Sequence, residues 1–310
     1  MNVKEFIETQ LEEIKRTVGP GNAISALSGG VDSSACTVLA HRALGSQLKS
    51  VFIDHGLMRA GEAQEIVQVF AGLGIAVDVA DKKKEYFAAL QGKADPEEKR
   101  KAFRYAFYSS FGQEVLKSKA RFLIQGTIAA DIIETQKGVK TQHNILEQIG
   151  IDPEKGFGFK VIEPLKELFK QEVRLVAKEL GLPESIWNRM PFPGPALATR
   201  IIGEVTPERV DLVRAATSIV EEEVAAHKPF QAFAVLLEDK GTGIVDGKRH
   251  FGNIVIVRSV ESQDAMTAEP SPLPWATLMK ISKRITAELP GVTRVAYELT
   301  SKPPATIEYI

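Results

Sequence analysis

The sequence predicts an α/β protein in which a parallel sheet with helices on both faces is followed by a smaller α+β domain. Two observations favour the parallel sheet. Short, almost continuously apolar strands alternate with helices in the first part of the chain, and a glycine-rich loop joins the first strand to a helix. In the second part, few helices and several strands favour an α+β arrangement. The chain of 310 residues exceeds the usual size of a single domain, so we expect two.

The first domain begins with an amphipathic helix over 2–18, which ends at Gly19 and Pro20. Strands are expected over 23–27, 48–53, 75–79, 121–125 and 159–162. Further helices are expected over 35–44, 62–73, 95–117 and 170–180, and the lysine run 82–84 is typical of a solvated surface. Ligands of such sheets bind outside the carboxyl ends of the strands, so we expect the site in the loops that follow them.

Glycine and proline cluster at 190–195, which predicts a domain boundary there. We therefore divide the chain into domains 1–188 and 189–310. In the second domain we expect strands over 200–202, 230–237, 253–260, 292–299 and 306–309, helices over 207–226 and 274–289, and a glycine-rich turn after 237. The segment 253–257 is apolar without alternation, which indicates either a central strand or a subunit interface.

The composition describes a globular protein with 44% hydrophobic and 25% charged residues and a formal net charge of -1. This balance argues against a broadly basic face for nucleic acid. No apolar run approaches the length of a membrane span and no signal peptide is visible, so we expect a cytoplasmic protein that binds neither nucleic acid nor membrane. The single cysteine, Cys36, excludes an intrachain disulfide and a cysteine metal cluster, and core packing explains it better than catalysis.

The loop that follows the first strand predicts a phosphate site. Its glycines permit close backbone approach to an anion, and the helix that follows directs its first N–H groups and the positive end of its dipole toward that anion. No lysine follows, so this is not a Walker A loop. An aspartate inside an anion site is explained if it binds Mg²⁺. The alternative is an ordinary turn with Ser33 as the N-cap. The loop residues are Ser28, Gly29, Gly30, Val31, Asp32, Ser33 and Ser34.

A second candidate region is the segment 128–158, where the hydrophobic rhythm weakens and glycines and charges accumulate. Loops of this length are uncommon unless they act as lids. The segment contains groups able to reach phosphate or metal, namely Asp131, Glu134, Lys140, His143 and Asn144. A third region, 54–59, leaves the second strand beside the loop, where Asp54 and Arg59 are either near a base or ribose or simply solvated.

The glycine-rich loop resembles the SGGxDS pyrophosphate loop of the N-type ATP pyrophosphatases, which have an adenine nucleotide alpha-hydrolase-like fold and cleave ATP between its α and β phosphates. Further segments resemble GMP synthase, and the similarity spans nearly the whole chain. They are 51–59 (VFIDHGLMR), 95–101 (DPEEKRK), 125–127 (QGT), 161–168 (VIEPLKEL), 191–195 (PFPGP) and 302–308 (KPPATIE). The resemblance covers the ATP-pyrophosphatase domain and the C-terminal dimerisation domain of that family.

The resemblance implies that XMP attacks the α-phosphate of ATP, which gives adenylyl-XMP and pyrophosphate, and that ammonia then displaces AMP to yield GMP. It implies that the loop binds pyrophosphate, that Asp32 binds Mg²⁺, and that Ile53 and Phe107 line the adenine pocket. Lys140, His143 and Asn144 would reach the phosphates from the lid, and Asp131 and Glu134 would serve metal binding or amination. The residues that match the XMP site are Arg100, Gln231, Lys302, Ile307 and Glu308.

Two features depart from the family pattern. The family lid usually has two adjacent histidines, whereas Gln142 precedes His143 here, and a glutamine hydrogen-bonds but does not titrate. We expect that this position contributes hydrogen bonds or lid folding. The glutamine amidotransferase domain of many GMP synthases has no counterpart in these 310 residues. The resemblance to two-subunit GMP synthases therefore implies a separate glutaminase subunit that supplies ammonia, with the C-terminal domain forming a homodimer.

Other functions remain open from the residues alone. Another pyrophosphatase-loop enzyme, such as an NAD synthetase or a tRNA thiolase, would share the loop, although thiolation favours additional cysteines and tRNA a basic surface. A non-catalytic adenine-nucleotide sensor would also keep the loop, but it has no need of Lys302 and Glu308.

Overall fold

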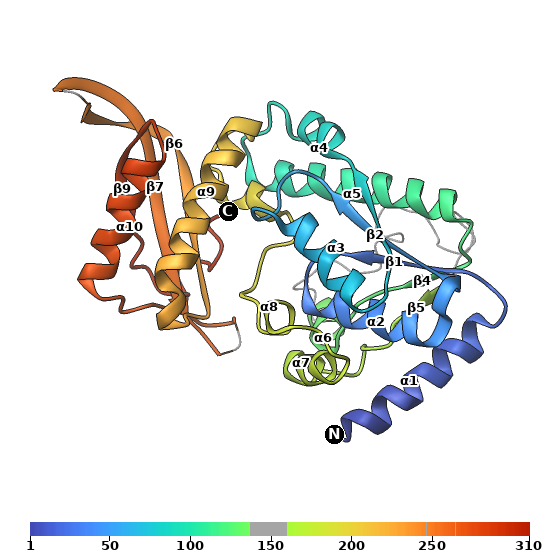
Figure 1. Ribbon diagram of the computed structural model, residues 1–310. Helices are drawn as coiled ribbons and strands as arrows, with labels where there is room; N and C mark the ends of the chain where they lie inside the picture. Colours follow the sequence, from blue (N-terminus) through green and yellow to red (C-terminus); the bar gives the residue numbers. More distant parts are fainter. Residues whose placement is uncertain (137–159, 246, 264) are drawn as a thin grey trace. The chain divides into compact units, whose positions relative to one another are not determined.

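The computed structural model describes residues 1–136, 160–245, 247–263 and 265–310, and the side chains of residues 134–136 and 245 are not among the features described. The chain divides into two compact units (Figure 1). Unit 1 comprises Met1–Asp54, Gly61–Lys82 and Ala106–Arg189, and unit 2 comprises His55–Ala60, Lys83–Tyr105 and Met190–Ile310. The division into domains 1–188 and 189–310 stays a prediction.

Unit 1 is built on a parallel sheet, as predicted. Among the described residues it has the strands β1 (Ala23–Leu27), β2 (Leu48–Asp54), β3 (Val77–Asp81), β4 (Phe122–Ile124) and β5 (Lys160–Ile162). Their order is β3-β2-β1-β4-β5, and every neighbouring pair is parallel. The order reverses between β1 and β4, so the carboxyl ends of these two strands form the switch point at which parallel sheets bind ligands.

Helices cover this sheet. They are α1 (Val3–Val18), α2 (Val31–Leu44), α3 (Glu62–Gly72), α6 (Ala129–Gln136), α7 (Lys170–Glu179) and α8 (Glu184–Trp187), with a 3₁₀ turn η1 (Gly45–Gln47). α1, α2 and α7 pack on one another, and α2 is buried along most of its length (Figure 1). Within the described residues, no helix is both long and apolar enough to cross a membrane.

The sequence did not predict two helices in this part of the chain. The helix α4 (Lys83–Leu90) begins within the lysine run, in which Lys83 and Lys84 are exposed as expected but Lys82 is buried, and its Tyr86 and Leu90, four residues apart, are fully buried on one side. Residues 129–136 of the predicted lid loop form α6, where the Asp131 carboxylate accepts from the N–H of Ile128 at 3.1 Å. The helix α5 (Pro96–Ser118) begins as predicted, with the Asp95 carboxylate accepting from two N–H groups of the first turn.

Unit 2 contains a mostly antiparallel sheet. Its strands are β6 (Gln231–Val245), β7 (Lys248–Glu261), β8 (Glu269–Pro270) and β9 (Val292–Tyr297), and its helices include α9 (Pro207–Val224), α10 (Trp275–Glu288) and the 3₁₀ segments η4 (Ala196–Arg200) and η5 (Ala225–His227). β7 pairs with β6 and β8 antiparallel and with β9 in parallel. Its central position explains the continuous apolar run at 253–257, of which Val255 and Val257 are buried.

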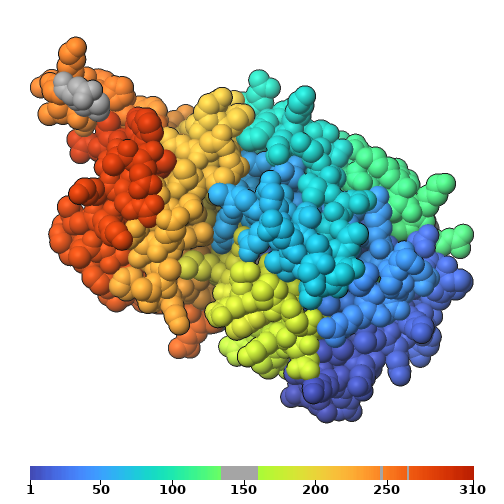
Figure 2. Space-filling view, in the orientation of Figure 1, coloured from blue at the N-terminus to red at the C-terminus, as the bar shows by residue number. Residues whose placement is uncertain are grey.

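The predicted glycine-rich turn is instead part of a long β6–β7 hairpin that extends beyond the rest of unit 2 (Figure 2). The glycines make room for β9. A Cβ atom at Gly243 or Gly252 would lie 2.7 or 2.3 Å from the Thr293 side chain. The predicted strand over 200–202 is not formed: Arg200 is the last residue of η4, and Ile201 makes a single bridge to Leu236.

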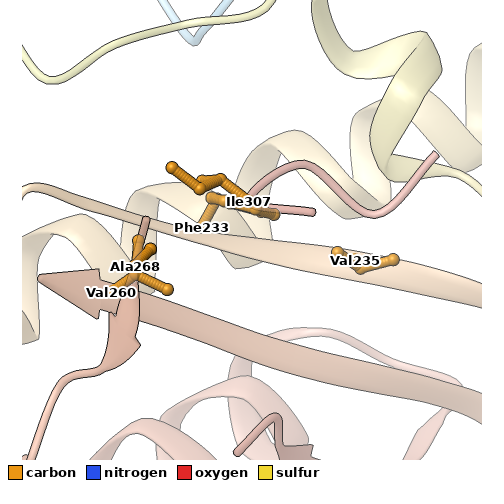
Figure 3. Close-up of a cluster of buried hydrophobic side chains, with 5 residues drawn as sticks. All are labelled: Phe233, Val235, Val260, Ala268 and Ile307. Atoms are coloured by element: carbon orange, nitrogen blue, oxygen red, sulfur yellow. The ribbon is translucent and has the colours of Figure 1, made fainter. Parts of the chain in front are cut away.

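The predicted strand over 306–309 is absent from the described residues, because this segment is fixed by side chains instead of a ladder. Arg258 donates to the carbonyls of Thr300 and Thr306 at 2.6 and 3.2 Å. The side chain of Ile307 packs with Phe233, Val235, Val260 and Ala268 in a buried cluster (Figure 3). The C-terminal segment is therefore anchored to the sheet of unit 2 through its core.

Candidate functional site

The loop 28–34 joins the carboxyl end of β1 to α2, as the strand–loop–helix pattern predicts. The hydroxyl oxygens of Ser28 and Ser33 are 2.9 Å apart, and the Ser33 hydroxyl donates to the Gly30 carbonyl at 3.1 Å and accepts from the Ser28 N–H at 3.2 Å. Ser33 therefore binds across the loop, and the N-cap position belongs to Gly30, which has no side chain to cap the helix. The first N–H groups of a helix lack partners within it, so this end of α2 suits an anion.

Two glycines allow close packing around this loop. Gly29 has φ +78°, a conformation that side chains other than glycine rarely adopt, and Gly126 follows β4, the strand beside β1. A Cβ atom at Gly126 would lie 2.9 Å from the backbone nitrogen of Ser33 and 3.0 Å from the carbonyl carbon of Asp32. The two loops of the switch point are thus in backbone contact at the start of α2.

Asp32 lies in the first turn of α2 and is paired on one side only. Its Oδ2 accepts from Nζ of Lys170, the first residue of α7, at 2.7 Å, whereas its buried Oδ1 has no hydrogen-bond partner. A buried carboxylate oxygen without a partner fits an Mg²⁺ ligand. In the described residues no group of three or more His, Cys, Asp or Glu side chains forms a metal site.

The segment after β4 adds further polar side chains near the carboxyl ends of β4 and β5. Gln125 Nε2 donates to the Thr127 hydroxyl at 3.1 Å, and that hydroxyl donates to Glu163 Oε1, beyond β5, at 2.5 Å. Asp131 caps the start of α6 in the same unit. Of the other predicted lid residues, Glu134 lies in α6, and Lys140, His143 and Asn144 lie outside the described residues together with Gln142.

The two predicted adenine-pocket residues lie on different elements of unit 1. Ile53 is buried at the carboxyl end of β2, next to the strand that carries the loop. Phe107 on α5 stacks on Phe111 with ring centroids 6.2 Å apart. Their contact with adenine stays a prediction. Arg59 belongs to unit 2, where its Nε donates to Glu221 at 3.0 Å and its guanidinium lies 4.3 Å from the Phe192 ring centroid.

The predicted XMP residues all belong to unit 2, and two of them touch. Gln231 Nε2 donates to Glu308 Oε1 at 2.5 Å, and Arg200 donates to both oxygens of the same carboxylate. Arg200 is fully buried, with Phe192 and Phe233 on its guanidinium at 4.8 and 4.1 Å. The carboxylate of Glu308 is therefore a hydrogen-bond acceptor with little freedom to turn.

The remaining predicted XMP residues have partners of their own. Lys302 Nζ donates to the carbonyl of Ala265 at 2.7 Å, and Ile307 belongs to the core cluster of Figure 3. Arg100 pairs with Glu97 on its own helix. Their role in binding XMP stays a prediction.

Sequence reasoning missed three charged residues of these sites. Lys170 and Arg189 contact the loop and Arg200 holds Glu308. For Arg200 a signal existed, because an arginine in the apolar run 196–202 must find a buried partner. Lys170 and Arg189 lie far from the loop in sequence, and nothing in their local pattern indicates the contact.

Comparison with known sequences finds family models that match both parts of the chain. Residues 2–195 match the family model "NAD synthase", and residues 218–309 match "GMP synthase C terminal domain". A subunit of the glutamine-hydrolysing GMP synthase of Archaeoglobus fulgidus is 52% identical over 310 residues, which covers 100% of both chains. The chain belongs to the GMP synthase family. The corresponding subunit of Thermococcus kodakarensis is also 52% identical, over 99% of both chains, and that of Methanopyrus kandleri is 49% identical over 99% of this chain and 98% of the relative.

Membership of this family makes the chain a ligase with an ATP-pyrophosphatase fold, as the resemblance implied. Because residues 218–309 match a GMP synthase model, the NAD synthetase alternative is less supported than membership of the GMP synthase family.

Proposed function

We propose that this chain catalyses the ATP-dependent amination of XMP to GMP through adenylyl-XMP, with release of AMP and pyrophosphate. The observation that supports it best is the anion-binding loop at the switch point of the sheet, with an unpaired buried oxygen on Asp32, in a chain that belongs to the GMP synthase family. ATP is the co-substrate in this reaction.

The loop and α2 bind the β and γ phosphates, which leave as pyrophosphate. Backbone N–H groups that are oriented before the reaction stabilise the charge that develops on the bridging oxygen. The protein then does not need to reorganise during the reaction. Lys170 Nζ donates to Asp32 Oδ2 at 2.7 Å and places a positive charge beside the loop. Asp32 Oδ1 is the oxygen that would hold Mg²⁺, and the ion when bound neutralises phosphate charge and polarises the α-phosphate.

In this proposal the second substrate, XMP, binds to residues of unit 2. Glu308 and Gln231, oriented by Arg200, present hydrogen-bonding groups of fixed direction to XMP. Lys302, Ile307 and Arg100 complete the assigned XMP residues. With both substrates held, the reaction needs little covalent chemistry from the protein, because positioning the XMP C2 oxygen against the α-phosphate supplies much of the acceleration.

The lid residues Lys140, His143 and Asn144 act on the phosphates, and Asp131 and Glu134 on metal or amination, in the same proposal. The relatives are named as one subunit of a glutamine-hydrolysing enzyme, which supports a separate glutaminase subunit as the ammonia source. We infer a homodimer through the C-terminal domain from the resemblance to that family.

Two other functions are less supported. An NAD synthetase-like activity fits residues 2–195 but not the match of 218–309 to the GMP synthase C-terminal model. A nucleotide sensor without catalysis fits the loop alone and leaves the Arg200–Glu308–Gln231 cluster without a role.

The decisive experiment incubates the protein with Mg-ATP, ammonium and XMP and measures AMP, pyrophosphate and GMP. XMP-dependent pyrophosphate release with GMP formation supports the proposal. Replacement of XMP by deamido-NAD tests the first alternative directly. Nucleotide binding without pyrophosphate release under any of these conditions would favour the sensor.

A further inference from the structure

A buried ion pair packs against the glycine-rich loop in unit 1. Glu62 is the first residue of α3, and Arg189 is the last residue of unit 1. Arg189 Nη1 lies 2.6 Å from Glu62 Oε1, and the Glu62 side chain is 1% exposed. None of the assigned substrate or metal roles uses this pair.

The same guanidinium nitrogen also reaches the loop. Arg189 Nη1 donates to the backbone carbonyl of Gly29 at 3.2 Å. A Cβ atom at Gly29 would lie 2.3 Å from Glu62 Oε1 and 3.2 Å from Arg189 Nη1. Gly29 therefore packs directly against the ion pair. The position requires glycine because a Cβ atom would clash with Glu62 and because its φ is +78°.

This contact controls the direction of a backbone donor. Because the peptide bond is planar and trans, the carbonyl of Gly29 and the N–H of Gly30 point in opposite directions. A hydrogen bond that fixes the Gly29 carbonyl therefore fixes the Gly30 N–H, which stands at the N-cap of α2 and donates to the Ser28 hydroxyl at a long 3.4 Å. Donors at a helix start bind phosphate best when their direction is set beforehand.

The charge of the pair explains why two residues are needed. A lone buried carboxylate beside a pyrophosphate site would repel the ligand, and a lone arginine would be free to turn toward the anion. Paired, the two charges cancel and Arg189 is held on the Gly29 carbonyl. The pair thus contributes orientation and little net charge.

We propose that Arg189, held by Glu62, is a positioning residue for the pyrophosphate loop. The inference rests on the proposed function only in taking the loop as the site of the ATP phosphates. The Glu62–Arg189 pair strengthens the binding of Mg-ATP and Mg-pyrophosphate and has no effect on the binding of XMP.

The main test is the double variant Glu62→Gln/Arg189→Met, which removes both charges of the pair together. We expect the KM for ATP and the Kd for Mg-pyrophosphate, from calorimetry, to rise about tenfold, the effect of losing one charge-assisted hydrogen bond. The KM for XMP should stay within about twofold of wild type. The single variant Glu62→Gln, which keeps an acceptor for Arg189, should fold normally and show a smaller rise of about threefold.

A matched control is Arg42→Met. Arg42 also donates to a backbone carbonyl in unit 1, that of Leu180 at 2.9 Å, but it lies in the last turn of α2, whereas the glycine-rich loop precedes the first. This variant should lower Tm without changing the KM for ATP. A structural role of the Glu62–Arg189 pair would give the same pattern as Arg42→Met.

The outcomes separate this inference from the proposed function. Unchanged pyrophosphate affinity in both Glu62 variants, or equal increases in the KM values for ATP and XMP, would overturn the positioning role. If the wild type binds Mg-pyrophosphate and the double variant binds it about tenfold more weakly, the positioning role holds even where no GMP is formed, because calorimetry does not depend on the amination step.

Discussion

The guanidinium of Arg200 donates two hydrogen bonds to the carboxylate of Glu308, from Nε to Oε2 at 3.1 Å and from Nη2 to Oε1 at 2.9 Å. This pair joins η4 to the C-terminal segment, 108 residues apart in sequence. The arginine is fully buried and its guanidinium lies 4.8 and 4.1 Å from the ring centroids of Phe192 and Phe233, so neither partner is free to reorient. A carboxylate held in this way has a defined direction before any substrate arrives.

The first prediction concerns this pair. Arg200→Lys keeps the charge but loses the planar fork, so Glu308 and Gln231 lose their fixed orientation. We expect the KM for XMP to rise by about tenfold and the KM for ATP to change by less than about twofold. Steady-state kinetics with each substrate varied separately gives both values.

Arg209→Lys is the control, because Arg209 also donates to backbone carbonyls in unit 2, those of Ile202 and Leu237, but does not contact Glu308. It should leave the KM for XMP unchanged. An Arg200→Lys enzyme with a normal KM for XMP would show that the pair only stabilises the fold.

The second prediction concerns Asp32. Asp32→Ala removes the unpaired oxygen Oδ1 and the partner of Lys170, so XMP-dependent pyrophosphate release should fall by at least about 100-fold while circular dichroism stays unchanged. Asp32 is at the start of a helix on a partly exposed edge, which explains why the fold should survive. Near-normal activity would contradict the assigned role.

The third prediction is a pH dependence of stability. Burial, with Arg209 nearby, lowers the pKa of Lys99 to about 8, and its Nζ donates to the Ile201 carbonyl at 2.6 Å. Between about pH 8 and the higher pKa of the unfolded chain, the unfolded state binds more protons than the native state, so stability rises with pH in that window. Below it both states are protonated and the cost of burying the charge is fully present.

The measurement compares wild type with Lys99→Met. From about pH 7.5 to about pH 9.5 the free energy of unfolding of the wild type should rise by about 2 kcal/mol relative to the variant. Lys101→Met, at an exposed position of the same helix, should show no such change. A constant difference between wild type and Lys99→Met would mean that Lys99 titrates normally.

The fourth prediction concerns the only cysteine. Burial raises the pKa of the Cys36 thiol well above its usual value, and the carboxylates of Asp32 and Glu163 add to the effect. Its Sγ donates to the Gln125 carbonyl at 3.5 Å. The neutral, buried thiol should not react with Ellman's reagent in the native protein and should react fully in guanidinium chloride. Rapid labelling of the native protein would show that the core around α2 opens.

Much of the first 190 residues was predictable, because the signals there are local. The glycine loop, the apolar strands and the Asp95–Pro96 helix start can each be recognised from a few neighbouring residues. The helix at 83–90 was missed because three lysines outweighed the spacing of Tyr86 and Leu90, although long lysine side chains are compatible with one buried face.

Tertiary contacts explain the remaining differences. The glycines at 243 and 252 looked like turn residues, yet they admit the Thr293 side chain of β9 to a continuous hairpin. The segment around Ile307 has strand-like composition but is fixed by Arg258. In the site, the loop and Asp32 were visible in the sequence, whereas the contact of Lys170 with the loop spans more than 100 residues and no local pattern encodes it. For Arg200 the apolar run 196–202 indicates a buried partner but not that the partner is Glu308.

The two units are interleaved in sequence, so no single cut in the chain separates them. The segments 55–60 and 83–105 follow strands of unit 1 in sequence but belong to unit 2. A fragment that begins at Met190 would lack Leu57, whose carbonyl accepts from the Leu197 N–H at 3.0 Å, and Lys99, which binds Ile201. Neither of the fragments 1–189 and 190–310 should adopt its native structure when expressed alone. Mixing the two fragments should restore structure that each lacks separately.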